Sequence, residues 1–286
     1  IFSVLFILGL SALIAPLVVH VQIIRQEVPI LMGASLLLLV LGLDGRISLT
    51  DAALLFGLLL AYTVFLVVQS RRQTQAATDE FVEAEIHAPA AGAWDARLPV
   101  QIALIVAGLA LLVLGSDWLV GAAVVFAKAL GVSDLVIGLT IVAAGTSMPE
   151  VATSVAAALK GERDIAVGNV VGSSTFNILG CLGLAGLVAG SEGLSVAPSL
   201  MAFDIWVMLA VALACLPIFL SGREIARWEG AVFLGYYAAY VSYLILAAQQ
   251  HDALHTYSAV MLGFVIPLTV ITLVVSLIRP AKAPKR

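Results

Sequence analysis

The sequence predicts an all-α, polytopic membrane helix bundle. It would contain two inverted-topology five-helix repeats, the first incomplete, and an extra helix at the C-terminus. Of the 286 residues, 62% are hydrophobic and 11% are charged, too few charges to cover a soluble domain of this length. The apolar residues come in runs near the roughly 20 residues that a helix needs to cross a bilayer. Segments of the two halves also resemble each other in the same order, which indicates the repeat.

The apolar runs predict nine membrane spans, because helices satisfy their own backbone hydrogen bonds in lipid. The predicted spans are 1–19, 28–44, 51–69, 99–128, 133–160, 164–189, 198–220, 229–248 and 257–278. The one long polar segment is typical of a solvated linker with a short helix. The predicted domains are a truncated first repeat at 1–69, the linker at 70–98, a second repeat at 99–248, and an extra helix with a basic tail at 249–286.

The basic residues predict an orientation. If the linker is cytoplasmic and the nine spans alternate, 12 of the 14 Lys and Arg residues fall on the cytoplasmic side. Only Arg46 and Lys128 fall on the other side. This asymmetry follows the positive-inside rule, and one missed helix would scramble it. We therefore expect the linker and the C-terminus to be cytoplasmic.

The repeat is carried by two pairs of segments. Residues 1–15 match 175–189, and residues 51–66 match 229–244 at a slightly larger offset. The repeat unit therefore holds five helices, and an odd number gives its two copies opposite topology, as in many secondary transporters. By this alignment two helices of the first copy would precede Ile1, so we expect an N-terminal truncation.

The fifth predicted span is interrupted near its middle. Pro149 has no N–H, so the carbonyl of Gly145 loses its helical partner. A carbonyl freed in this way within lipid must be satisfied by another group. A cation is one candidate for that group.

Four residues around this break share one helix face. Ala143, Thr146, Ser147 and Glu150 lie at i, i+3, i+4 and i+7. A backbone carbonyl, two hydroxyls and a carboxylate could thus point to one place. Hard cations such as Ca²⁺ and Na⁺ take these oxygen ligands.

The next span presents a second polar face. Asn169, Ser173 and Asn177 lie at i, i+4 and i+8, and a short turn joins this span to the one before. Two antiparallel helices could therefore turn both faces to one pocket. Thr153 and Ser154 are more typical of hydroxyls that bond a neighbouring helix or their own backbone.

The acidic residues within spans differ in what they predict. Glu150 lies at the membrane centre, where an ionisable side chain is costly, so a functional role is favoured over a protonated, hydrogen-bonded structural Glu. Asp117 fits an accessory site, a gate contact or an interface residue equally well. Asp204 lies near a helix end, which favours a solvated, cap-like role. No Lys or Arg lies in the middle of a span, so the intramembrane charge favours cations over anions.

Residues 138–180 resemble the second α-repeat of the cation/calcium exchanger superfamily, specifically that of bacterial calcium/sodium antiporters. The resemblance rests on a G-T-S-x-P-E segment that ends at Glu150 and on a G-N-x-x-G-S segment that ends at Ser173. It implies ten core helices in two inverted halves, a central cation site and alternating access in the bacterial inner membrane. Carried over by motif, the metal-binding residues are Ala143 (through its carbonyl), Thr146, Ser147, Glu150, Ser173 and Asn177.

The chain departs from the family pattern at two positions of the facing helix. Many members carry Asp where this chain has Asn177. The Asn therefore removes one possible negative charge from the site. Ser174 replaces an Asn. In the first repeat, Ser3 takes the place that corresponds to Asn177, and the missing first α-repeat is the expected partner that completes the site.

The resemblance and the residues together predict a calcium/sodium antiporter. Calcium/proton exchange with Glu150 titrating, and an uncoupled cation channel, remain open. An intramembrane metalloenzyme is disfavoured because all four His residues lie at span ends or in loops. We expect transported Ca²⁺ and Na⁺, no prosthetic group, a lipid bilayer as partner and no nucleic acid.

Overall fold

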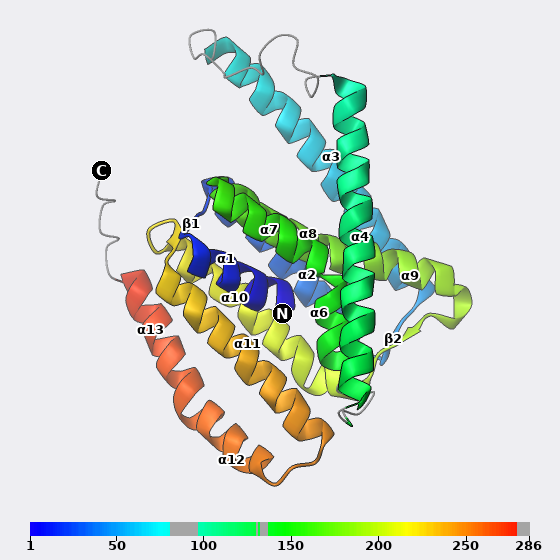
Figure 1. Cartoon of the computed structure of the whole chain (residues 1–286), viewed down its shortest axis with the longest axis vertical. Coiled ribbons are helices and arrows are strands. Elements are labelled where there is room, and N and C mark those ends of the chain that lie inside the picture. Colours follow the sequence, from blue (N-terminus) through cyan, green and yellow to red (C-terminus); the bar gives the residue numbers. More distant parts are fainter. Residues whose placement is uncertain (81–96, 130, 132–136, 279–286) are drawn as a thin grey trace.

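The computed structural model describes residues 1–80, 97–129, 131 and 137–278 and shows a helix bundle (Figure 1). Seven helices in this part of the chain are long and apolar enough to cross a membrane. The elements of the first half, with η for π or 3₁₀ helix, are η1 (Ser3–Leu8), α1 (Gly9–Ile14), β1 (Leu17–Val18), η2 (Ile23–Glu27), α2 (Val28–Leu41), β2 (Arg46–Ile47) and α3 (Leu49–Glu80).

The second half is longer and ends in an additional helical segment. Its repeat consists of α4 (Leu98–Ala129), η4 (Gly138–Val142), α6 (Ala143–Thr146), α7 (Met148–Lys160), α8 (Arg163–Phe176), η5 (Asn177–Cys181), α9 (Leu182–Ala189), η6 (Gly190–Glu192), β3 (Leu194–Ser195), η7 (Leu200–Asp204), α10 (Ile205–Leu220), β4 (Glu224–Ile225) and α11 (Arg227–Ala248). The additional segment consists of α12 (Ala253–Val260), η8 (Met261–Val265) and α13 (Ile266–Ile278).

Every predicted span corresponds to helix in the structure. Seven of the nine are the long apolar helices, the first is the shorter stretch Ser3–Ile14, and the fifth is broken between α6 and α7. Several boundaries differ from the prediction: the helix of the first span ends at Ile14, and that of the second begins at Ile23. The last span begins at Ala253, and α3 continues through Glu80, so the start of the predicted linker is helical. The remainder of that linker, 81–96, lies outside the described residues.

The two halves are related by inverted pairs of helix contacts. Helix α1 of the first half packs against α11 of the second, and its repeat counterpart α9 of the second half packs against α3 of the first. The first crossing is close because Gly9 faces Gly230, where an added Cβ would lie 2.7 Å from the Gly9 carbonyl oxygen. The repeat-related crossing places Gly183 against α3, where a Cβ would lie 2.8 Å from the Phe56 amide nitrogen. Small residues let membrane helices approach in this way.

Two short antiparallel strand pairs repeat the same symmetry. Strand β1 pairs with β4, with Leu17 opposite Ile225, and β2 pairs with β3, with Ile47 opposite Leu194. Each pair joins a loop of the first half to a loop of the second half. The repeats are therefore tied together at both ends of the bundle, as an inverted arrangement requires.

A substitution at the first crossing tests this packing. We expect Gly230→Ala to lower the free energy of unfolding by about 1–3 kcal/mol, because the new methyl group meets backbone atoms of α1 that cannot turn away. Gly235→Ala is the matched control on the same helix, since a Cβ there meets nothing within 4 Å. Thermal unfolding in detergent measures both. Equal stability of the two variants would contradict the close crossing.

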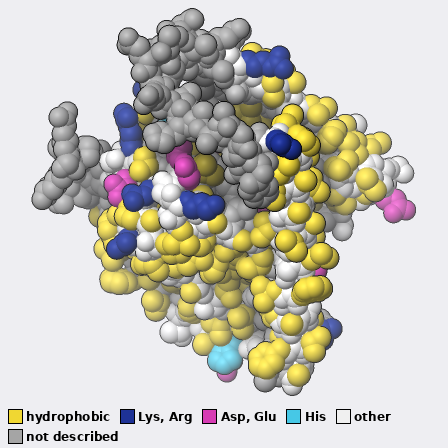
Figure 2. Space-filling model, turned by 45° about the horizontal axis from the view of Figure 1, so that its top comes forward, with side chains coloured by type: hydrophobic (Ala, Val, Ile, Leu, Met, Phe, Trp, Pro, Cys, Tyr) yellow, Lys and Arg dark blue, Asp and Glu magenta, His cyan; other side chains and the backbone are white. Residues whose placement is uncertain are grey.

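The surface fits a bilayer. Apolar side chains cover the middle of the visible face, and most of the Lys and Arg side chains in view lie in its upper half (Figure 2). Helix α4 exposes large apolar side chains along its whole length, and Trp118 is 75% exposed. Such a continuous apolar surface is unstable in water and is normal where lipid is the solvent. The chain is thus a multi-pass membrane protein.

Candidate functional site

The predicted helix break is present and lies between α6 and α7. Helix α6 ends at Thr146, Ser147 leaves the helical region with φ −99° and ψ 9°, and α7 begins at Met148. Pro149 occupies the first turn of α7, where its missing N–H costs nothing. The Ser147 N–H donates to the carbonyl of Ala144 at 3.1 Å, which tightens the last turn of α6. Proline and the tightened turn together divide this span into two half-helices.

The carbonyl of Gly145 has a protein partner. The Ser116 hydroxyl of α4, which is buried, donates a hydrogen bond to this carbonyl at 2.5 Å. The sequence had left a cation as one candidate for this role, and the structure assigns the role to a serine. Ser116 was missed because it is an unremarkable hydroxyl in an apolar helix, and only the packing of α4 on α6 brings it to the break.

The break creates an electrostatic environment that suits a cation. Glu150 lies in the first turn of α7, and the carbonyl ends of α6 point towards the same break. The carbonyl end of a helix carries partial negative charge, and broken transporter helices use such ends to coordinate cations. His20 Nε2 lies 3.4 Å from Asp164 Oδ2, and no ion pair to Glu150 is found among the described side chains. Glu150 therefore has no basic partner within this part of the chain.

Asn169 fixes the register between α7 and α8. Its side-chain amide donates to the Ser154 hydroxyl at 2.9 Å, to the Thr153 hydroxyl at 3.2 Å and to the backbone carbonyl of Glu150 at 3.4 Å. Thr153 also bonds the carbonyls of its own helix, as predicted for a structural hydroxyl. The helices are antiparallel, so Ser173, one turn beyond Asn169 on the same face, lies towards the break. Asn169 is thus a helix-to-helix contact between the two polar faces.

Removal of this contact has a predicted cost. We expect Asn169→Ala to lower the free energy of unfolding by about 1–3 kcal/mol, because two hydroxyls and a carbonyl lose a donor between packed helices. Thr272→Ala is the control, since its hydroxyl is exposed and bonds only its own helix. Thermal unfolding of the two variants in one detergent makes the comparison. An unchanged Asn169→Ala would show that these bonds do not hold α7 on α8.

The two predicted ligands of the facing helix, Ser173 and Asn177, make different hydrogen bonds. The Ser173 hydroxyl donates to the carbonyl of Val170 at 3.3 Å, so its lone pairs remain for a ligand. Asn177 begins the π-helix η5, and its side-chain oxygen accepts a hydrogen bond from the Cys181 thiol at 3.4 Å. The π-helix η1 begins at Ser3, the repeat counterpart of Asn177. The same local geometry therefore appears in both halves at this position.

A central cavity of about 170 Å³ lies where the two halves meet. Its polar lining residues are Ser3, Ser35, Ser174 and Asn177. Helices α2 and α10 correspond when they are aligned through the π-helices that precede them, η2 and η7. Most of the lining then consists of repeat-related pairs: Ser3 with Asn177, Val4 with Ile178, Leu31 with Met208, and Ser35 with Ala212. The cavity thus lies on the pseudo-two-fold axis, the position expected for a transporter site built from inverted repeats.

The structure divides the predicted ligands into two neighbouring groups. Asn177 lines the central cavity, whereas Thr146, Ser147 and Glu150 lie on the α6–α7 break outside its lining. Ala143 is the first residue of α6, which places its carbonyl within the half-helix that ends at the break. Across residues 1–80, 97–129, 131 and 137–278, no three His, Cys, Asp or Glu side chains cluster.

The other two acids differ in their surroundings. Asp117 is exposed on α4, beside the buried Ser116, and its role stays a prediction. Asp204 occupies the residue before α10 and makes no capping hydrogen bond, so the cap-like role was wrong. It accepts a hydrogen bond from the Tyr240 hydroxyl at 2.7 Å, a contact between distant helices that sequence spacing does not reveal.

Comparison with known proteins gives consistent results. Residues 1–68 and 100–246 match the sodium/calcium exchanger protein family. The chain is 35% identical over 213 residues to the inner membrane protein YrbG of Escherichia coli, covering 74% of this chain and 64% of YrbG. It is 43% identical over 141 residues to the sodium/calcium exchanger MaX1 of Methanosarcina acetivorans, covering 49% of this chain and 39% of MaX1.

A solved structure agrees with the fold. The sodium–calcium exchanger NCX_Mj superimposes with a TM-score of 0.64 at 28% sequence identity, covering 85% of this chain and 73% of NCX_Mj. The chain thus shares its overall fold with an exchanger of known structure. Since the family match spans both halves of the chain, this protein belongs to the sodium/calcium exchanger protein family.

Proposed function

We propose that this chain exchanges Ca²⁺ for Na⁺ across a membrane by alternating access. The observation that carries the proposal is the broken span, which sets Glu150 at a helix break with no basic partner among the described residues. An ionisable side chain within a membrane span costs free energy, so its presence there indicates a functional role. The MaX1 and NCX_Mj likenesses support Ca²⁺ and Na⁺ as the two ions.

The ligand set is composed entirely of oxygen. It consists of the Ala143 carbonyl, the Thr146, Ser147 and Ser173 hydroxyls, the Glu150 carboxylate and the Asn177 side-chain oxygen. These are the ligands that Ca²⁺ and Na⁺ prefer. Ca²⁺ and Na⁺ exclude each other from one pocket, and this mutual exclusion couples the two fluxes. No chemical step takes place, so the activity is transport and not catalysis.

A second carboxylate completes the site in this proposal. Ca²⁺ loses its hydration on binding, and one Glu offsets that loss only in part. The inverted repeat indicates where the other acid belongs, at the position related to Glu150 by the pseudo-two-fold axis. We assign it to a first α-repeat that pairs with 138–180. The functional units are then the first repeat at 1–69, the linker at 70–98, the second repeat at 99–248 and the added segment at 249–286.

The proposed setting is the bacterial inner membrane. The name of YrbG supports this location, and the asymmetry of Lys and Arg supports a cytoplasmic linker and C-terminus. In this orientation the β1–β4 pair lies on the cytoplasmic side and the β2–β3 pair on the opposite side. The two strand pairs would then border the two mouths of the alternating pathway.

Flux from proteoliposomes tests the function. The natural full-length protein, reconstituted in vesicles loaded with Na⁺, is diluted into Na⁺-free medium that contains radioactive Ca²⁺. Exchange predicts Ca²⁺ uptake that requires the outward Na⁺ gradient and can exceed the equilibrium Ca²⁺ level. Uptake driven equally well by a pH jump without Na⁺ would instead identify proton exchange. Uptake that only equilibrates Ca²⁺, with no gradient of either ion, would identify a channel.

A further inference from the structure

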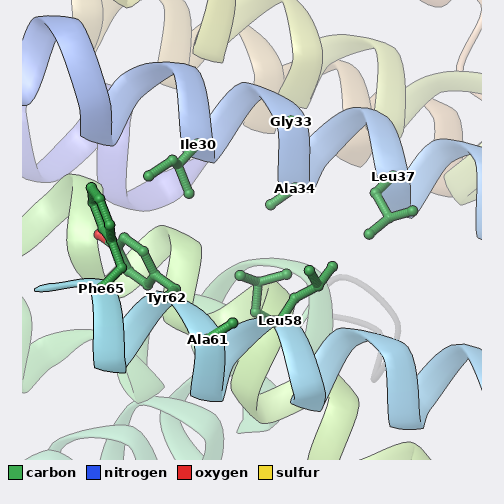
Figure 3. A pocket seen from close by; sticks show the side chains of 9 residues that line it. Ile30, Gly33, Ala34, Leu37, Leu58, Ala61, Tyr62 and Phe65 are labelled. Carbon is green, nitrogen blue, oxygen red and sulfur yellow. The ribbon is translucent and has the colours of Figure 1, made fainter.

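A second cavity, of about 420 Å³, opens between α2 and α3 (Figure 3). Side chains of both helices point into it (Figure 3), and Leu179 of η5 also lines it. The lining is apolar apart from the Tyr62 hydroxyl, and consists of Ile30, Gly33, Ala34, Leu37, Leu58, Ala61, Tyr62, Phe65 and Leu179. We call this cavity the α2–α3 groove.

The repeat supplies a twin of this groove between α10 and α11, and the twin is filled. Leu58 and Ala61 correspond to Tyr236 and Ala239 of α11. The Tyr236 hydroxyl is hydrogen-bonded to the Thr269 hydroxyl of α13, and the Tyr257 hydroxyl of α12 donates to the Ala239 carbonyl at 2.8 Å. Helix α13 also packs on α10. The added C-terminal segment thus occupies the twin groove.

Among the described residues of the first half, no helix occupies the α2–α3 groove as α13 occupies its twin. In the second repeat, α4 packs on η4, α6 and α7, away from the groove between α10 and α11. Repeat symmetry therefore assigns no helix of the five-helix unit to the α2–α3 groove. The apolar side chains around its mouth face outwards, with Val64 61% and Phe65 45% exposed. In a membrane the groove opens to lipid.

Polar and basic groups gather at one end of the groove. The Gln69 side-chain amide donates to the Gln26 side-chain oxygen at 2.6 Å and so bridges α2 to α3. Arg25 precedes Gln26 in the chain, Arg71 lies two residues beyond Gln69, and both arginines are exposed. Neither is found in an ion pair among the described side chains. Two guanidinium groups at the end of an apolar slot match the phosphate and acyl chain of a phospholipid.

We propose that the α2–α3 groove binds one anionic phospholipid, whose acyl chain takes the place that α13 takes in the twin groove and whose phosphate lies at Arg25 and Arg71. The added C-terminal segment is then a built-in replacement for such a lipid in the other half. The acyl chain would contact Leu179, two residues beyond Asn177. The lipid would thereby pack against the π-helix that carries a proposed ligand.

Filling the groove tests the proposal. A Cβ at Gly33 meets nothing within 4 Å, so Gly33→Phe can project its ring into the groove without a clash at the backbone. Gly57→Phe on α3 is the matched control, since a Cβ there also meets nothing within 4 Å and Gly57 does not line the groove. Each protein is extracted from vesicles of phosphatidylethanolamine and phosphatidylglycerol and weighed by native mass spectrometry.

The expected result is a retained phosphatidylglycerol on the wild type and on Gly57→Phe. Its occupancy should fall by about tenfold in Gly33→Phe, equivalent to about 1.4 kcal/mol of binding free energy. In the double variant Arg25→Gln, Arg71→Gln, preference for phosphatidylglycerol over phosphatidylethanolamine should disappear. Thermal unfolding checks that each variant is folded, and Ala61→Phe repeats the test from the opposite wall.

Two results would overturn the proposal. One is an equal number of retained phosphatidylglycerol molecules on the wild type and on both groove-filling variants. The other is a dimer mass for the wild type and for Gly57→Phe that disappears in the groove-filling variants. That result would mean that a second copy of the chain occupies the groove. Neither readout depends on ion flux, so the lipid site and the proposed exchange can fail separately.

Discussion

Glu150→Gln is expected to reduce Na⁺-driven Ca²⁺ uptake by about 100-fold or more. The amide keeps the size of the side chain and one oxygen, but it removes the one carboxylate that the described part of the chain brings to the break. Loss of one anionic partner of a buried cation costs about 3 kcal/mol, which is about 100-fold in affinity. The measurement is the initial rate of radioactive Ca²⁺ uptake into Na⁺-loaded proteoliposomes of the full-length protein.

The control for this variant is Glu162→Gln. Glu162 is an exposed carboxylate in the turn between α7 and α8, so the substitution changes the net charge equally without touching the break. We expect its uptake rate to equal that of the wild type. Full exchange activity in Glu150→Gln, at equal protein content of the vesicles, would remove Glu150 from the site.

The repeat and the helix break could be predicted because both depend on local sequence. Identical residues at matching offsets, such as Gly9 with Gly183, predicted the inverted relation, and these residues make the twin helix crossings. Pro149 acts within one turn of chain, so its effect could be placed to within two residues. The span count followed from hydrophobic length, which the bilayer thickness imposes on each helix separately.

The contacts that complete the site could not be predicted in the same way. Ser116 and Asp204 each bond a group on another helix, and neither partner follows from spacing along one helix. Asn169 was predicted to share a face with Ser173, but its side-chain amide donates a hydrogen bond to Ser154 of α7. Lipid-exposed and buried faces of a membrane helix are both apolar, so hydrophobic periodicity carries little information about which face packs.

Gly145 is the position where packing around the break is tightest, and Gly145→Ala is expected to be severe. An added Cβ would lie 1.8 Å from Cγ2 of Val120 on α4. Valine is stiff about χ1, so this methyl group cannot swing aside, and α6 would have to move away from α4. The move would also break the hydrogen bond from Ser116 to the Gly145 carbonyl. We expect the free energy of unfolding to fall by about 3 kcal/mol.

If the clash with Val120 causes the loss of stability in Gly145→Ala, a second substitution at Val120 should reverse it. Val120→Ala removes both Cγ atoms, and the nearest remaining atom of the side chain, Cβ, lies 3.1 Å from the new methyl group. The double variant should therefore recover most of the stability lost in Gly145→Ala, a coupling that a double-mutant cycle of thermal unfolding measures directly. Gly108→Ala, with nothing within 4 Å of its Cβ, should behave like the wild type. If Val120→Ala gives no recovery, the clash with Val120 is not the cause of the loss, and the contact between α4 and α6 does not hold the broken helix in place.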